Sequence, residues 1–288
     1  MRITDKLKHT FVITAEVDPP RGADPGQTIE QALTLRGYVD AVNISDAPMA
    51  NLRMNSFMLA HLIKNRTGVE VIPHLTARDR NAIALQADLL GAWALGVKNV
   101  LVLGGDPPDR GDHPWAKPVY EFGAVELARA VSSLNEGANL AGGDLEGHTG
   151  FSVGVAVNPG AADVELEVSK FMAKVEAGAL FAQSQPVFDV EKALFFLEAL
   201  GGSSPIPILW GVLPLRSAKM AANVSRWTEV PGWLMADVEK RGKVAGMEAA
   251  QRVLADLHAA GMAGAHLYPL GRVELLKEML KPVGARLH

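Results

Sequence analysis

The 288-residue chain contains no cysteine, which excludes disulfides, a thiol nucleophile and cysteine-ligated zinc or iron–sulfur clusters. No apolar run reaches the roughly 18 residues that a membrane-spanning helix needs. The first residues lack the apolar core of a signal peptide. We therefore expect a cytoplasmic protein with no membrane span.

Clusters of basic residues are also missing. Lysine and arginine total 28 against 32 acidic residues, which gives a formal net charge of −4. Because neutralising the phosphates of a nucleic acid requires grouped Lys and Arg, we expect no nucleic-acid partner. The hydrophobic share of 48% is enough for a large core. The length alone allows one large α/β domain or two smaller ones.

The most informative stretch is an apolar run that ends in glycine and aspartate. Residues 100–103 are apolar and short, which favours a buried strand over a helix. The strand breaks at Gly104 and Gly105, where a ligand can approach the backbone closely. Asp106 and two prolines follow, and proline cannot continue a paired strand. Asp106 either belongs to an active site or caps the next turn, and this stretch alone leaves both interpretations open.

Short apolar segments alternate with amphipathic ones along the whole chain. We expect strands over residues 11–17, 39–45, 69–76, 99–103, 151–157, 180–185, 206–213 and 265–270. We expect helices over residues 28–36, 51–65, 79–95, 122–134, 163–177, 190–200, 217–227, 244–260 and 273–280, with Gly96, Gly178 and Gly261 ending three of them.

This alternation predicts parallel strands joined by right-handed crossovers. Eight such units predict an α/β fold of the (β/α)8 TIM-barrel type, in which residues 1–288 form a single domain. An open doubly wound sheet is the alternative. The first strand, however, is not followed by the G-x-G-x-x-G turn that is typical of that fold.

In such a barrel the functional site lies at the C-terminal ends of the strands. The residues that the pattern places there are mostly polar: Glu16, Asp18, Ser45, Asp46, His74, Thr76, Asp106, Asn158, Gln183, Gln185, Tyr268 and Arg272. For Asp18, Ser45, Asp46 and Thr76, closing a turn explains the residue at least as well as function does. His74 alone is a weak metal signal, and we predict no metal site.

Glu16 and Asp106 are the stronger candidates, because an unneeded charge beside a buried strand is costly. Glu16 follows an apolar run, and no Lys or Arg stands near it before Arg21. We therefore predict that desolvation raises the pKa of Glu16, as a general acid at neutral pH requires.

Residues 135–150 form a glycine-rich interruption between a helix and a strand. Long segments without regular structure in compact domains are often functional. We predict a mobile lid or a partner contact, with a plain surface loop as the alternative.

Several motifs, in a consistent order, give the chain a resemblance to the methylenetetrahydrofolate reductases. They are Thr14-Ala-Glu-Val-Asp-Pro-Pro-Arg21, Pro73-His-Leu-Thr76, Leu103-Gly-Gly-Asp-Pro-Pro108, Lys174-Val-Glu-Ala-Gly178, Gln183-Ser-Gln-Pro-Val-Phe-Asp189, Gly211-Val-Leu-Pro-Leu215 and His266-Leu-Tyr-Pro-Leu-Gly-Arg272. Each motif is weak alone, and together they cover almost the whole chain. The surroundings of Gly104 and Asn158 look most like the branch found in acetogens and in fusions with homocysteine methyltransferases.

The resemblance implies a flavoprotein of one-carbon metabolism and methionine biosynthesis, with flavin and folate at the strand C-termini. It implies ping-pong hydride transfer, in which NADH or NADPH reduces the flavin before methylenetetrahydrofolate enters. By motif, Glu16 and Asp106 match catalytic positions, with Glu16 as the general acid at N10. Gln185, Tyr268 and Arg272 match folate-binding positions, with Arg272 at the glutamate tail. The matching flavin-contacting positions are Ser45, His74, Gly104, Gly105, Asp106, Asn158 and Lys174.

The chain departs from the best-known members of that family at three places. Gly104 stands where they have arginine, Asn158-Pro159-Gly160 where they have Tyr-Pro-Glu, and Ala218 where some have an aromatic residue near the nicotinamide. These departures leave FAD, FMN and a flavin-independent mode open, as well as the electron donor. Lys174 also has a plain structural interpretation, since a cation near a helix C-terminus complements the helix dipole.

Two other functions compete with the reductase. One is the barrel subunit of a larger electron-transfer complex, and we accordingly expect either a homo-oligomer or a partner subunit. The other is a different barrel enzyme such as an aldolase. An aldolase needs a Schiff-base lysine at a strand end or a metal set, and neither is evident.

Overall fold

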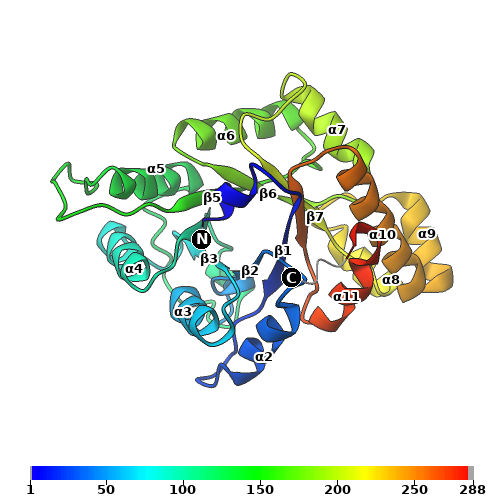
Figure 1. The fold of residues 1–288 in the computed structure, drawn as a ribbon, viewed down its shortest axis with the longest axis horizontal. Coiled ribbons are helices and arrows are strands. Elements are labelled where there is room, and N and C mark those ends of the chain that lie inside the picture. Colours follow the sequence, from blue (N-terminus) through cyan, green and yellow to red (C-terminus); the bar gives the residue numbers. More distant parts are fainter. Residues whose placement is uncertain (1, 285–288) are drawn as a thin grey trace.

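The computed structural model describes residues 2–284, in which eight parallel strands close into one barrel (Figure 1). The strands are β1 (Val12–Val17), β2 (Ala41–Ile44), β3 (Val71–Thr76), β4 (Asn99–Leu103), β5 (Ser152–Val157), β6 (Phe181–Pro186), β7 (Ile208–Val212) and β8 (Gly264–Leu267). They pair in chain order, and β8 closes onto β1. The predicted single-domain (β/α)8 TIM barrel is confirmed, and the open-sheet alternative is wrong.

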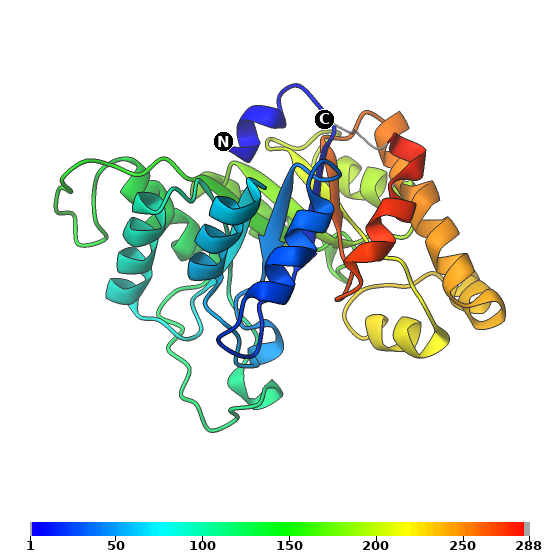
Figure 2. The same cartoon turned by 60° about the horizontal axis from the view of Figure 1, so that its bottom comes forward.

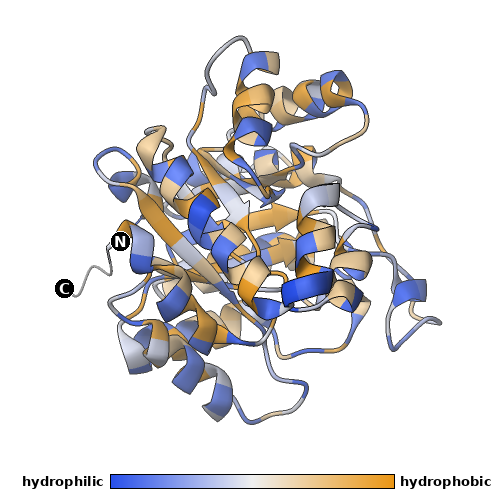
Figure 3. Cartoon of the chain, turned by 90° about the vertical axis from the view of Figure 1, so that its right-hand side faces the viewer, coloured by the Kyte–Doolittle hydropathy of each residue, from blue (hydrophilic) through white to orange (hydrophobic). Residues whose placement is uncertain are grey.

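Helices surround the barrel as an outer ring (Figure 1). They are α2 (Gly26–Leu35), α3 (Ser56–Thr67), α4 (Ala82–Ala94), α5 (Ala124–Asn135), α6 (Val164–Glu176), α7 (Val190–Ala199), α8 (Ala218–Val224), α10 (Lys243–Ala259) and α11 (Leu276–Met279). The helix predicted over residues 273–280 is divided into the 3₁₀ turn η3 (Val273–Leu275) and α11. Figure 3 shows apolar strands inside and helices with mixed faces outside, as burial on one helix face requires.

Local sequence signals set most helix ends. Gly96, Gly178 and Gly261 have φ values of +84°, +100° and +69° and lie just beyond α4, α6 and α10, which confirms their predicted role. Helix α9 (Gly232–Arg241) was not predicted, although Pro231 precedes it and Gly242 follows it. Helix α1 (Ile3–Lys6) was also not predicted, because four residues carry almost no periodic signal.

The N-terminal end of the barrel is closed by apolar side chains. This N-terminal plug consists of Ile3, Leu7, Val12, Ala41, Ile72, Leu101, Phe181 and Leu209, all buried. Helix α1 lies across the N-terminal end of the barrel, and its Ile3 N–H donates to Asn99 Oδ1 at 2.7 Å. Figure 2 shows α1 at one end of the barrel, whereas the long loop after β4 projects from the other. A ligand site within the barrel therefore has to open at the C-terminal end.

The glycine-rich segment 135–150 joins α5 to β5, so it lies at the N-terminal end of the strands. The prediction of a lid is wrong, because a loop that precedes a strand cannot cover the opposite end of the barrel. Asn135 ties the base of the segment, since its Oδ1 accepts hydrogen bonds from Thr149 Oγ1 and from the Phe151 N–H. The partner-contact interpretation stays a prediction.

Candidate active site

A cavity of about 450 Å³ opens at the C-terminal ends of β1 to β4. Its lining includes Arg78 and eight residues that the sequence placed at the strand ends, namely Glu16, Ser45, Asp46, His74, Thr76, Gly104, Gly105 and Asp106. A small recess beside it is lined by Glu16, Asp18 and Tyr268. The strand-end rule therefore brings residues from four strands into one mouth cavity, of the size expected for a small-molecule site.

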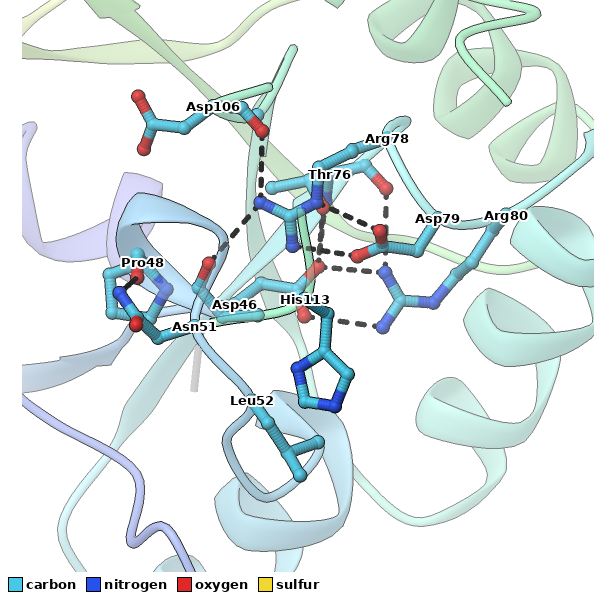
Figure 4. A network of polar contacts seen from close by, with 12 residues as sticks. Asp46, Pro48, Asn51, Leu52, Thr76, Arg78, Asp79, Arg80, Asp106 and His113 are labelled. Carbon is cyan, nitrogen blue, oxygen red and sulfur yellow. Dashed lines mark hydrogen bonds and ion pairs between the residues drawn. The ribbon is translucent and has the colours of Figure 1, made fainter. Parts of the chain in front are cut away.

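A buried ion pair anchors one rim of the mouth cavity (Figure 4). Asp46 Oδ2 accepts hydrogen bonds from the N–H and Oγ1 of Thr76, both at 2.9 Å. The Arg80 guanidinium forks onto the same carboxylate at 2.7 and 3.2 Å. Burial raises the pKa of Asp46, but the bonds from Arg80 and Thr76 outweigh burial and lower it. Asp46 and Thr76 thus close a turn, as the structural interpretation of them predicted.

Arg78 connects the loops that follow β2, β3 and β4 (Figure 4). Its side chain is only 3% exposed and pairs with Asp79 at 2.6 Å. Its Nη1 donates to the carbonyl oxygens of Ala47 at 3.3 Å and Asp106 at 3.2 Å. Sequence reasoning missed this residue, because the partners of Arg78 outside its own loop lie about thirty positions away in both directions.

Two glycines form the floor of the mouth cavity where β4 ends. A side chain at Gly104 would meet no atom within 4 Å, so the space above it is open. Gly105 has φ +91°, and a Cβ there would lie 3.0 Å from Thr76 Cβ. The structure therefore leaves room for a side chain or a ligand at 104, whereas the backbone conformation requires glycine at 105.

Asp106 does not simply cap its own turn. Its Oδ2 accepts a hydrogen bond from the Met49 N–H at 3.1 Å, so it reaches the loop after β2. In that loop Ala47, Met49 and Ala50 all have positive φ, which is strained for residues other than glycine. Strained backbone clusters at ligand sites, and here it lies along the rim of the mouth cavity.

Glu16 lies beside a histidine that the sequence does not place near it. His266 is 1% exposed, and its Nε2 lies 3.8 Å from Glu16 Oε2. Burial raises the pKa of Glu16, but the polar contact with His266 and the charges that His74 and His266 can carry together lower it. The predicted upward shift is therefore wrong for the ligand-free protein, because the neighbours that matter come from β3 and β8.

Below Glu16 a chain of buried polar side chains crosses the barrel. It consists of Thr14, Asn43, Gln183, His74 and His266, linked by hydrogen bonds of 2.8 to 3.2 Å. Burial lowers the pKa of His74 to about 4, so this ring is neutral at pH 7. Inward-facing polar residues on buried strands were the available signal for Asn43 and Thr14, and it was not used.

Asn158, Lys174 and Gln185 are among the predicted residues that do not line the mouth cavity. Asn158 Oδ1 accepts from the Gly160 N–H at 3.1 Å and so shapes the turn after β5. Lys174 Nζ donates to the Ala156 carbonyl at 2.7 Å, and burial lowers the pKa of this lysine. Gln185 lies near the end of β6. Any ligand contact by Asn158 or Lys174 has to compete with these internal bonds.

Tyr268 and Arg272 follow β8 on the other side of Glu16. The Tyr268 hydroxyl donates to the Ser184 carbonyl at 2.9 Å, and burial raises the pKa of that hydroxyl. Arg272 lies in a separate cavity of about 790 Å³, where Arg216 and Lys243 join it and outnumber the two acidic lining residues, Glu248 and Glu278. Leu270 borders both this basic cavity and the recess next to Glu16, so the two spaces adjoin.

Residues 2–284 offer neither a metal-binding cluster nor a membrane-spanning helix. No group of three or more His, Asp or Glu side chains in this part is arranged to hold a metal ion. No helix within the same range is long and apolar enough to cross a membrane.

Fold and site together define a (β/α)8 barrel whose C-terminal mouth presents the Glu16 carboxyl group and a glycine floor, next to the basic cavity. The family model of methylenetetrahydrofolate reductase matches residues 2–284. The chain therefore belongs to the methylenetetrahydrofolate reductase family and is an enzyme of that family, which confirms the resemblance drawn from the motifs.

Two relatives illustrate the match. The 5,10-methylenetetrahydrofolate reductase of Escherichia coli strain K12 is 27% identical over 95% of this chain and 91% of its own. The enzyme of that name from Pectobacterium carotovorum is 27% identical over 98% of this chain and 93% of its own.

Solved structures share the fold at lower identity. A Clostridium thermocellum protein that binds two copies of 5-methyl-5,6,7,8-tetrahydrofolic acid is 13% identical, with a TM-score of 0.63 over 96% of this chain and 98% of its own. A 2,3-dimethylmalate lyase reaches a TM-score of 0.56 at 13% identity over 99% of this chain and 87% of its own. Since barrels of this kind host different reactions, these two likenesses show the fold alone.

Proposed function

We propose that this protein reduces 5,10-methylenetetrahydrofolate to 5-methyltetrahydrofolate at the mouth cavity. The observation that carries the proposal is the position of Glu16. This carboxyl group lines the cavity from β1, together with the glycine floor and Asp106, which follow β4. Family membership supplies the substrate, and the geometry supplies a candidate acid beside a space for it.

Glu16 has a defined task in this reaction. The bond between the bridging carbon and N10 of the folate breaks, its electron pair stays on N10, and the Glu16 proton forms the new N–H bond. The remaining iminium cation at N5 then accepts a hydride. The Glu16 carboxylate left behind and Asp106 are fixed negative charges near the cation, and such preorganised charges stabilise it.

A flavin, FAD or FMN, would supply the hydride chemistry when bound, and the protein would supply position and electrostatics. The open space above Gly104 and the polar groups of Ser45, His74 and Asp106 fit a flat heterocyclic ring. These residues would hold the ring, and Gly105 would keep the backbone close to it. The order of events, in which the donor leaves before folate enters, is part of the proposal.

A second candidate is a reductase that works without a flavin, or a subunit fed by a partner protein. The observation in its favour is that the arginines at the mouth are already engaged. Arg78 pairs with Asp79, and Arg80 pairs with Asp46. With Lys174 bonded to Ala156, a flavin diphosphate finds few free cations among the predicted residues.

Folate binding would extend from the mouth cavity into the basic cavity. Tyr268 and Gln185 would contact the pterin, and Arg272 would meet the glutamate tail. An arginine is suited to this task because its planar fork binds a carboxylate through two hydrogen bonds. The adjoining of the two cavities at Leu270 supports this path.

The purified protein tests the proposal directly. Its absorbance spectrum and the mass of any released cofactor distinguish FAD, FMN and no flavin. Turnover of methylenetetrahydrofolate with NADH, NADPH or reduced methyl viologen then identifies the donor. Formation of methyltetrahydrofolate by the wild type supports the proposal, and no formation with any of the three donors contradicts it.

A further inference from the structure

The buried chain below Glu16 has a fixed hydrogen-bond direction. Asn43 Nδ2 donates to His74 Nε2 at 3.0 Å and to Gln183 Oε1 at 2.8 Å. Gln183 Nε2 donates to Asn43 Oδ1 at 3.1 Å and to Thr14 Oγ1 at 3.2 Å. Each amide NH2 group has two protons to give, so both are fully used. The Thr14 oxygen is therefore an acceptor toward Gln183.

The Thr14 hydroxyl contacts one ring nitrogen of His266, and we assign the hydroxyl as the donor in that contact. Its oxygen lies 2.8 Å from His266 Nδ1, and its single proton is available for that nitrogen. A neutral His266 then carries its ring proton on Nε2, the atom that faces Glu16 Oε2 at 3.8 Å. Tyr268 packs edge-on against the ring with centroids 4.5 Å apart, which holds the ring in this orientation.

We propose that His266 is a positioning residue that holds Glu16 as a carboxylate until folate covers it, so that the acid acquires its proton when substrate binds. The Glu16 side chain is 20% exposed, so solvent can reach its charge, and the Nε2 atom of His266 lies 3.8 Å from Oε2. A folate ring over the cavity removes the water, and burial then favours the neutral acid. The proton comes from solvent, becomes the O–H of Glu16, and is released to N10 as that bond breaks.

The other charged groups around Glu16 fit this assignment. His74 faces it from β3 but is neutral at pH 7 because it is buried. Asp18 faces it from the end of β1, and the Glu16 charge helps to raise the pKa of Asp18. Tyr268 faces it from β8, and Asp46, Arg78 and Asp106 line the rest of the mouth cavity. His266 thus presents a ring nitrogen to the Glu16 carboxylate at 3.8 Å, and this interaction lowers the pKa of Glu16.

The inference rests on the proposed function and is tested by proton uptake, without turnover. Methyltetrahydrofolate is titrated into the holoenzyme at pH 7 in buffers of different ionisation enthalpy, and calorimetry gives the protons bound per folate. The wild type should take up a substantial fraction of a proton, approaching one. Glu16→Gln should take up none, because it has no carboxylate to protonate.

Variants of His266 separate its role from general packing. His266→Phe keeps a ring against Tyr268 but has no donor, so uptake should fall by at least half. His266→Gln retains an amide donor and should stay near the wild type. His258→Phe is the matched control, because His258 contacts Phe11 next to the N-terminal end of β1. If His266→Phe does not fold, carboxyl ¹³C NMR of the wild type serves instead. The signal that Glu16→Gln lacks should change from carboxylate to acid when folate is added.

Two results overturn the inference and leave the proposed function intact: folate binding by the wild type without proton uptake, and uptake by His266→Phe equal to that of the wild type. Persistence of a carboxylate signal for Glu16 in the folate complex has the same meaning. Failure of the wild type to bind methyltetrahydrofolate overturns the proposed function itself, and the inference with it.

Discussion

The two ends of the barrel are built from the same eight strands, but one end is filled with apolar side chains and the other is polar and open. The N-terminal plug is apolar, and side chains such as Phe181 and Leu101 fill the space between the strands there. At the C-terminal mouth the inward positions carry Glu16, His74 and Asp106, and space remains. The plug shows that apolar packing is enough where the strands serve only stability. Buried polar groups are costly, so their concentration at the other end indicates function.

The largest loss of stability is expected from a substitution in the N-terminal plug. Phe181→Ala removes a fully buried ring and should lower the free energy of unfolding by about 3–5 kcal/mol. The folded fraction should keep its kcat, since the plug lies at the end opposite to the mouth. Denaturant unfolding and steady-state kinetics measure the two effects. A large loss of kcat in fully folded protein would show that the ends are not independent.

At the rim of the mouth the strongest stability effect should come from the Asp46–Arg80 pair. Asp46→Asn removes one of two carboxylates that pair with Arg80, since Asp88 Oδ2 also lies 2.9 Å from Arg80 Nε. The cost should therefore fall below the roughly 3–5 kcal/mol of breaking a fully buried pair. The folded-state pKa of Asp46 lies below its ordinary 3.8. Its contribution is therefore present above that value and is lost as the pH falls through the lower, folded-state pKa.

Unfolding measured from pH 7 down to pH 2 tests this linkage. The difference in stability between the wild type and Asp46→Asn should shrink at the acid end. A difference that stays constant over the whole range would exclude the charge of Asp46 as its source.

The two glycines of the floor should respond differently to substitution. Gly104→Val fills open space and should reduce flavin occupancy strongly while the fold stays intact. Gly105→Val should also strain the backbone, by about 1–2 kcal/mol, because of its φ of +91°. Cofactor content by absorbance and thermal unfolding distinguish the two variants. Full flavin occupancy in folded Gly104→Val would rule out the proposed ring position.

The smallest effect is expected in the basic cavity. Arg272→Ala should raise the KM for folate about tenfold, the scale of one charged hydrogen bond, and should hardly affect flavin reduction. The effect is limited because Arg272 is 59% exposed and already pairs with Glu274. Lys277→Ala is the control, since this lysine stacks on Tyr38 instead. An unchanged folate KM for Arg272→Ala would remove Arg272 from the binding path.

The sequence predicted the architecture well, because hydrophobic periodicity and the glycines that end helices are local properties of the sequence. Every strand was found, and Gly96, Gly178 and Gly261 ended the expected helices. It also gathered Glu16, His74 and Asp106 at one end, since a parallel barrel sends all strand C-termini there. The lid prediction for residues 135–150 failed because it ignored which end of the barrel a helix-to-strand loop occupies.

Electrostatics could not be predicted in the same way. No residue close to Glu16 in sequence reveals His266, which is 250 positions away and enters through the pairing of β1 with β8. The same holds for Arg78, whose carbonyl partners come from two other loops. A pKa depends on neighbours in space, and closure of the barrel decides which they are.

The most direct test of Glu16 as the proton donor measures the two half-reactions of Glu16→Gln by stopped flow. This substitution keeps the shape of the side chain and removes the acid. Reduction of the folate should slow by roughly 10²-fold or more, the scale of a lost general acid, whereas reduction of the flavin by its donor should hardly change. Equal slowing of both half-reactions, or of neither, would contradict the assignment of Glu16 as the proton donor.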